Sequence, residues 1–139
     1  MSWTLRFLGV GNAQAIELGS ASSVIECDGK PELMIDCGQE ALTAYVQQYG
    51  VMPDAAFITH VHMDHVAGLE RLFYKTYFDP ARAGKVRLYV PVTVLPFLQQ
   101  RLAEYPGVIA EGGANWWDGF QLIPVSKGFW HNGFWYDVF

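Results

Sequence analysis

The sequence predicts an α/β fold in which strands and helices alternate and pack in layers. In the middle of the chain, a β-favouring apolar run at 55–59 precedes a helical pattern of apolar residues at 66–77. A second strand-like run, 86–90, precedes another amphipathic stretch at 94–105. This alternation is typical of helices packed on a sheet. Since no internal repeat, low-complexity tract or obvious linker interrupts the pattern, we expect residues 1–139 to form one domain.

The N-terminal third is expected to supply a strand, a hairpin and a helix. Residues 3–8 predict the first strand, which ends at a Gly-Val-Gly turn. Two further runs, 21–27 and 33–35, flank an Asp-Gly-Lys-Pro turn and predict a β-hairpin. Residues 40–49 then carry apolar side chains at helical spacing, and Gly50 is placed to end that helix as its C-cap.

The C-terminal part is expected to add a capped helix, a strand and a second hairpin. Thr93 is the expected N-cap of the last helix, and residues 120–125 form the next apolar run. Asn132 and Gly133 lie between two aromatic-rich runs, which is a strong signal for a two-residue hairpin turn. The final strand of this hairpin is predicted at 134–139.

Composition favours a soluble globular protein and argues against two other classes. The chain has 139 residues, of which 51% are hydrophobic and 15% aromatic, enough to build one core. A net charge of −5 and a pI near 5.2 disfavour broad nonspecific nucleic-acid binding. No apolar run approaches the roughly 20 residues of a membrane span, and no signal-peptide pattern opens the chain. We therefore expect a cytoplasmic protein that has no membrane segment.

The two cysteines, Cys27 and Cys37, are expected to remain thiols. If the strands of the first hairpin pair, Cys27 faces a residue near Glu32 or Leu33, and Cys37 lies too far along the second strand for normal disulfide geometry. Neither cysteine belongs to a Cys-x-x-Cys pattern of the kind that binds metals. We expect two buried thiols that take no part in the functional site.

Three of the four histidines and one aspartate fall within six consecutive positions, directly after the predicted strand 55–59. His60 and His62 lie two residues apart, so in an extended backbone their side chains point the same way and can address one ion. Asp64 and His65 follow as the chain turns into the next helix, and they can address a second point in space. We expect a metal site on a loop at the C-terminal end of this strand.

The donor atoms of this cluster suit a divalent metal ion. Imidazole nitrogen and carboxylate oxygen are ligands of zinc, and manganese and iron are alternatives. The helical zincin motif needs two histidines four residues apart, which the i, i+2, i+5 spacing cannot supply. The alternative without a metal is a polar turn whose histidines only satisfy backbone groups.

The stretch Thr59-His-Val-His-Met-Asp-His65 resembles the signature of the metallo-β-lactamase superfamily of metal-dependent hydrolases. The resemblance implies two divalent metal ions. His60 and His62 would help to hold the first ion, and Asp64 and His65 would help to hold the second. It also implies that Asp64 can orient the attacking water or accept its proton, which makes Asp64 the expected catalytic residue.

Two upstream segments extend the resemblance. Residues 34–38, Met-Ile-Asp-Cys-Gly, are similar to the superfamily's strand-end aspartate motif, which implies that Asp36 supports the metal loop without being a ligand. The opening segment 7–13, together with Ser-Ser-Val-Ile at 22–25, is similar to the start of the branch that contains the tRNA 3′-processing endonuclease and related phosphodiesterases.

The superfamily's complete domain is a four-layer αβ/βα sandwich of two similar halves, and this chain resembles the first half. The remaining ligands, a third histidine for the first metal and a bridging aspartate, would lie beyond Phe139. His131 is a poor candidate for the missing histidine because it adjoins the Asn-Gly turn, and we expect it to be a hairpin residue. We therefore expect the sequence to be a fragment whose sheet keeps an apolar face open to association, for example as a homodimer.

Basic residues concentrate just after the metal loop. Five of the nine lie at 71–87, where Asp79 is the one acidic residue: Arg71, Lys75, Arg82, Lys85 and Arg87. They form either a solvated helix face or a rim that attracts anions. The second interpretation predicts a phosphodiesterase that cleaves a small anionic substrate or RNA with metal-activated hydroxide. A thioester, lactone or β-lactam hydrolase of the same superfamily is the alternative, as is a metal-binding protein without catalysis.

Overall fold

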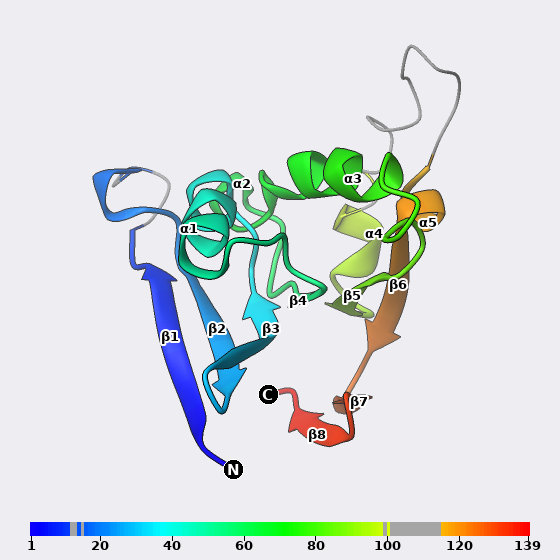
Figure 1. Ribbon diagram of the computed structural model, residues 1–139. Coiled ribbons are helices and arrows are strands. Elements are labelled where there is room, and N and C mark those ends of the chain that lie inside the picture. Colours follow the sequence, from blue (N-terminus) through cyan, green and yellow to red (C-terminus); the bar gives the residue numbers. More distant parts are fainter. Residues whose placement is uncertain (12–13, 15, 99, 101–114) are drawn as a thin grey trace.

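The computed structural model describes residues 1–139 apart from 12–13, 15, 99 and 101–114 (Figure 1). Within the described residues, the main sheet has six strands that follow one another in sequence order: β1 (Trp3–Gly9), β2 (Ser22–Cys27), β3 (Lys30–Ile35), β4 (Ala55–Phe57), β5 (Val86–Pro91) and β6 (Phe120–Val125). Strands β1 to β3 pair antiparallel, and β3 to β6 pair parallel. The sheet is therefore mixed, and the predicted α/β class is confirmed.

The helices gather on one face of this sheet (Figure 1). In the described part of the chain they are the 3-10 helix η1 (Ile16–Leu18), α1 (Gln39–Tyr49), α2 (Met63–Val66), α3 (Leu69–Tyr77), α4 (Leu95–Leu98) and α5 (Trp116–Gly119). Leu42 of α1 and Phe73 of α3 have no exposed surface, and both belong to the same apolar cluster as Leu88 of β5. Each of α1 to α5 contributes a buried residue to this cluster, which fixes the helical layer on the sheet.

Helix boundaries follow the sequence closely at α1 and less closely afterwards. Gly50 ends α1 as predicted, with a φ of 74° and an N–H bonded to the carbonyl of Val46. The single helix predicted at 66–77 is instead split into α2 and α3, because the N–H of Gly68 donates to Cys37 outside the helix. Helix α4 begins at Leu95, so Thr93 does not directly precede it, and half of the predicted helix 94–105 lies outside the described residues.

A second hairpin covers part of the opposite face of the sheet (Figure 1). It consists of β7 (Gly128–His131) and β8 (Phe134–Asp137), joined by Asn132 and Gly133 with φ values of 50° and 83°. Two successive positive φ angles are what a type I′ turn requires, so the Asn-Gly prediction is confirmed. Phe129 of β7 stacks on Tyr89 of the main sheet, with ring centroids 4.2 Å apart.

The rest of that face is partly open. Trp3, Leu5 and Phe7 alternate along the edge strand β1 and are 43%, 51% and 67% exposed. Leu5 pairs with Ile25, which packs in the apolar cluster under the hairpin, so these side chains belong to the face away from the helices. None of the helices among the described residues is long and apolar enough to cross a membrane.

The cysteines are both free, as expected, but the predicted environment of Cys27 is wrong. Cys27 pairs with Lys30, because the register of β2 against β3 shifts between Ile25 and Glu26. It is also partly exposed rather than buried. Cys37 is buried, and burial raises the pKa of its thiol to about 12.

His131 joins the hairpin to the main sheet, as expected for a hairpin residue. It is 4% exposed, with Nε2 2.9 Å from the carbonyl oxygen of Glu32 and Nδ1 2.7 Å from the hydroxyl of Tyr89. A carbonyl can only accept a hydrogen bond, so Nε2 donates to Glu32 and Nδ1 accepts from Tyr89. In the neutral ring these contacts place the proton on Nε2, and burial favours this neutral form over the charged one.

This arrangement predicts that stability depends on pH through His131. Burial lowers the pKa of His131, so below the ordinary value of about 6.5 the unfolded chain binds a proton that the folded chain excludes. Stability from this group is present above that pH and is lost as the pH falls. We expect the free energy of unfolding of the full-length protein to decrease from pH 7 to pH 5, and to decrease less in His131→Gln. Denaturant titrations at each pH measure it, and equal slopes in the two proteins would contradict it.

Candidate metal centre

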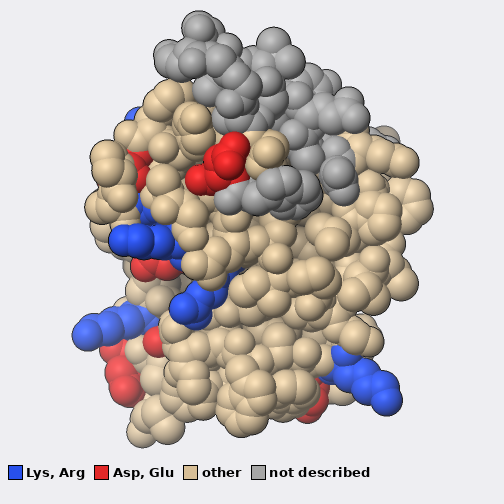
Figure 2. All heavy atoms as spheres, turned by 90° about the vertical axis from the view of Figure 1, so that its right-hand side faces the viewer, with Lys and Arg blue, Asp and Glu red and all other residues tan. Residues whose placement is uncertain are grey.

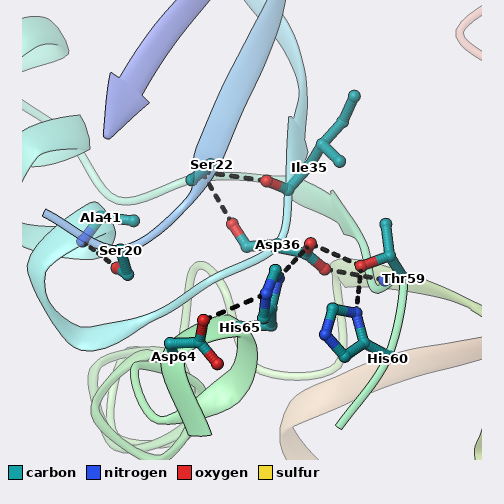
Figure 3. Close-up of polar contacts among 9 residues, drawn as sticks. All are labelled: Ser20, Ser22, Ile35, Asp36, Ala41, Thr59, His60, Asp64 and His65. Atoms are coloured by element: carbon teal, nitrogen blue, oxygen red, sulfur yellow. Dashed lines mark hydrogen bonds and ion pairs between the residues drawn. The ribbon is translucent and has the colours of Figure 1, made fainter. Parts of the chain in front are cut away.

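Asp36, His60 and His65 come together where the parallel strands β3 and β4 end. Asp36 directly follows β3 and His60 lies three positions beyond β4. The carboxyl ends of parallel neighbours meet at one edge of a sheet, which is where binding sites of α/β proteins form. One carboxylate oxygen and one nitrogen of each ring lie within 4.8 Å of one another. Figure 3 shows these side chains turned toward a common centre, with Asp64 beside them.

The Asp36 carboxylate accepts hydrogen bonds from three donors (Figure 3). Its Oδ1 accepts from the backbone N–H of Thr59 at 2.7 Å, and its Oδ2 accepts from the Thr59 hydroxyl and from Nδ1 of His65, each at 2.6 Å. The side chain is almost fully buried, and its backbone has a φ of 62°, a left-handed conformation that is uncommon outside glycine. Such strain tends to persist at functional sites, where the surrounding structure over-determines it.

Backbone contacts hold the metal loop against the end of β3. The N–H of Cys37 donates to the carbonyl of His65 at 2.7 Å, and the N–H of Gly68 donates back to the carbonyl of Cys37 at 2.9 Å. A Cβ at Gly38 would collide with the carbonyl oxygen of Asp64, and one at Gly68 would lie 2.5 Å from the carbonyl oxygen of Gly38. The two glycines therefore permit the close approach that positions Asp64 and His65.

The three histidine side chains and the aspartate side chain of the motif lie close together, with the ring of His60 nearer to His65 than to His62. Oδ2 of Asp64 lies 3.2 Å from Nε2 of His65. Two ligands of a tetrahedral zinc with bonds of about 2.0 Å are separated by about 3.3 Å, so this pair fits one ion. The rings of His60 and His62 are 4.9 Å apart in a T-shaped arrangement, and those of His60 and His65 are 3.8 Å apart. The geometry is compatible with two neighbouring ions, and the assignment of ligands stays a prediction.

The local secondary structure agrees in part with a loop site. His60 and His62 lie outside helices, and His62 is the N-cap of α2. Asp64 and His65 are already within α2, whose single turn directs them back toward the end of β3. Strand β4 is shorter than the predicted strand 55–59, since it ends at Phe57.

The same residues admit a second arrangement, in which Asp36 joins His60 and His65 around one ion. Oδ2 of Asp36 already accepts two hydrogen bonds, so coordination through this atom would compete with both. If Asp36 only supports the site, it keeps all three of its hydrogen bonds. Nε2 of His60 and Nε2 of His65 are then left to bind the metal. Burial, together with the nearby His65, lowers the pKa of His60. This favours the neutral imidazole that a metal requires.

Thr59 takes part in this network, although sequence reasoning gave it no function. The signal that could have pointed to it is its place directly before His60, between the end of a strand and the first expected ligand. Its hydroxyl contacts Asp36 on one side and Nδ1 of His60, at 2.9 Å, on the other.

The basic residues of 71–87 do not form one rim around the site. Arg82 forms an ion pair with Asp54 at 2.7 Å, and Arg87 projects to the hairpin side of the sheet, where it approaches the turn. Arg71 and Lys75 of α3 line an open groove of about 700 Å³ that reaches the end of α2. On the face seen in Figure 2, Lys and Arg occupy separate places, several of them beside Asp or Glu. Of the predicted basic cluster, Arg71 and Lys75 are therefore the two residues that line a groove. They are also the two that follow the metal loop most closely in the sequence.

Comparison with solved structures defines the class of this protein. The chain superposes on a diphosphatase from the PhnP family with a TM-score of 0.68 at 19% identity, over 96% of the chain and 54% of that structure. It superposes on the metallo-β-lactamase fold protein YhfI from Bacillus subtilis with a TM-score of 0.62 at 15% identity, over 92% and 49%. These likenesses show the fold: the chain has about half of a metallo-β-lactamase fold, as the motif implied.

The sequence comparisons then give the family. The family model of the Anti-Pycsar protein Apyc1 matches residues 3–134, and the chain belongs to this family. The Apyc1 protein of Saccharibacillus brassicae is 36% identical over 126 residues, which cover 89% of the chain and 50% of that relative. The chain thus spans about half the length of this curated relative. Ribonuclease Z of Methanopyrus kandleri is 34% identical over 90 residues, 63% of the chain and 31% of that protein, in line with the predicted tRNA-processing branch.

The paired ligands predict the metal content of the full-length protein. The two ligand pairs that the motif predicts should give about two divalent ions per chain, and His60→Ala or Asp64→Ala should remove at least one, since each deletes a ligand that the other pair cannot replace. Elemental analysis after gel filtration measures the ratio. His131→Gln, which alters the histidine outside the motif, is the matched control and should keep the full content. Unchanged metal in both alanine variants would rule this site out.

Proposed function

We propose that the whole protein is a metal-dependent phosphodiesterase, and that its substrate is a small anionic phosphodiester, of which a cyclic nucleotide is a simple example. The observation that carries the proposal is the cluster of His60, His62, Asp64 and His65 where the parallel strands β3 and β4 end. The family match and the similarity to ribonuclease Z support it.

The donor set fits zinc or a related ion, with imidazole and carboxylate ligands that are partly buried. Bound metal would lower the pKa of water from about 15.7 toward 7 and so supply hydroxide at neutral pH. The chain's own residues have separate tasks in this chemistry. His60, His62 and His65 offer ring nitrogens, Asp36 holds His65 in one orientation, and Asp64 is placed to orient the attacking water or to accept its proton.

The charge distribution favours a small phosphodiester over a long RNA. A phosphodiester gains negative charge as it is attacked, so cations near the site help its transition state more than that of a neutral lactone or lactam. Arg71 and Lys75 supply two such cations in the groove beside α2, which Glu70 and Asp79 also line. A long RNA backbone would need an extended basic surface, whereas the net charge is −5 and the basic residues are dispersed.

Two alternatives remain distinct from this proposal. A thioester, lactone or β-lactam hydrolase would use the same ligands with a neutral substrate. A non-catalytic protein would hold one ion in a closed site with four protein ligands, His60, His62, Asp64 and His65.

A comparison of substrates tests the proposal in the metal-loaded full-length protein. Turnover of a cyclic nucleotide and of an aryl phosphodiester should exceed turnover of a thioester and a β-lactam. Asp64→Ala should reduce phosphodiester turnover by at least about 100-fold. Lys75→Glu should reduce kcat/KM by about 10-fold, because it reverses a charge that attracts the anion.

The matched control is Lys127→Glu, which makes the same change of net charge at an exposed lysine between β6 and β7. It should leave kcat/KM close to the wild-type value. Dominant thioester or lactam turnover that is insensitive to Lys75→Glu would show that the phosphodiesterase proposal is wrong. A protein that binds metal but hydrolyses none of these substrates would favour the non-catalytic alternative.

A further inference from the structure

The hydroxyl of Thr59 lies between the Asp36 carboxylate and the ring of His60 (Figure 3). We propose that Thr59 is a positioning residue that fixes His60 as its Nδ1–H tautomer, so that Nε2 is the nitrogen offered to the metal. The inference rests on the proposed function only for the identity of what Nε2 binds. The tautomer itself follows from the chain's own contacts.

The argument begins with the single hydrogen of the hydroxyl. Oγ1 of Thr59 lies 2.6 Å from Oδ2 of Asp36 and 2.9 Å from Nδ1 of His60. A carboxylate has no proton to donate, so the hydroxyl hydrogen must point to Asp36. Oγ1 can then only accept from His60, which requires a proton on Nδ1. Since a neutral imidazole carries one ring proton, the lone pair is left on Nε2.

The same carboxylate fixes the tautomer of His65 directly. Its Nδ1 lies 2.6 Å from Oδ2 of Asp36, so Nδ1 must donate and Nε2 must carry the lone pair. That Nε2 faces Asp64 at 3.2 Å. One buried oxygen atom thus sets the tautomers of two histidines, one directly and one through Thr59.

The relay matters because water favours the opposite form. A solvated neutral histidine prefers the proton on Nε2, and that form would block with a proton the nitrogen that is to bind the metal. Partners that hold a ligating histidine in one tautomer commonly contribute 10- to 100-fold to metal affinity. The backbone N–H of Thr59 makes its own bond to Oδ1 of Asp36, so removal of the hydroxyl leaves the loop attached to the carboxylate.

Thr59→Val tests the relay, because valine keeps the shape and the backbone bond and lacks the hydroxyl. Two-bond ¹H–¹⁵N spectra of the metal-free, full-length protein, recorded at a pH where the histidines are neutral, report the tautomer of each ring. In the wild type, His60 and His65 should both carry the proton on Nδ1. In Thr59→Val, His60 should shift toward the Nε2–H form while His65 stays unchanged as an internal control.

Zinc affinity, measured by competition with a chelator, gives the second readout. It should weaken by about 10- to 100-fold in Thr59→Val and recover in Thr59→Ser, which restores the hydroxyl. Thr43→Val, which removes a hydroxyl from the exposed side of α1, should change neither readout.

An Nε2–H tautomer of His60 in the wild type would overturn the proposal, as would a His60 tautomer that does not change in Thr59→Val. An affinity lost equally in the serine variant would also overturn it, because the effect would then be independent of the hydroxyl. These measurements need no substrate, so a failure of the phosphodiesterase assays would leave them interpretable.

Discussion

The buried carboxylate of Asp36 is the interaction on which the site depends. It sits in a left-handed backbone position at the end of β3 and binds the two segments that carry the histidines: Thr59 after β4 and His65 in α2. A buried carboxylate is costly unless its lone pairs are satisfied. Here they are satisfied by groups of the metal loop itself, so burial of Asp36 and order in the loop require each other.

The fold supplies this carboxylate with a rigid frame. Ser22 of the neighbouring strand β2 donates its hydroxyl to the backbone carbonyl of Asp36 at 2.9 Å, and the parallel pairing of β3 with β4 brings Thr59 within reach of the carboxylate. The glycines at 38 and 68 let the backbone of α2 pack directly on the end of β3. Gly38, Gly68 and Asp36 thus hold the histidines in place without a metal. Such preorganisation lowers the cost of binding.

Much of this architecture was predictable because local chemistry determines it. Asn132 and Gly133 specify a type I′ turn by their tolerance of positive φ, and Gly50 ends α1 for the same reason. The spacing of His60, His62, Asp64 and His65 predicted a metal site without knowledge of the sheet, and the structure brings His60 and His65 together with Asp36 there. The superfamily resemblance, rather than periodicity, supplied the supporting position of Asp36.

The rest depended on contacts between distant parts of the chain. The break between α2 and α3 arises because Gly68 donates to Cys37, about thirty positions away, and the pairing of Cys27 depends on a register shift inside the hairpin. The basic residues are clustered in the sequence but not in the structure. Arg82 forms an ion pair with Asp54, and Arg87 lies on the hairpin side of the sheet. The function of Thr59 could not be seen until Asp36 and His60 were placed on either side of it.

The central claim is that Asp36 orients the metal ligands and is not one of them. Anomalous diffraction at the zinc edge, from crystals of the metal-loaded full-length protein, tests this most directly. The account predicts two neighbouring peaks, one bound by Nε2 of His60 and by His62, the other by Asp64 and Nε2 of His65. In that structure Asp36 stays hydrogen-bonded to Thr59 and His65, outside bonding distance of either ion. A single peak bound directly by the Asp36 carboxylate would contradict the account.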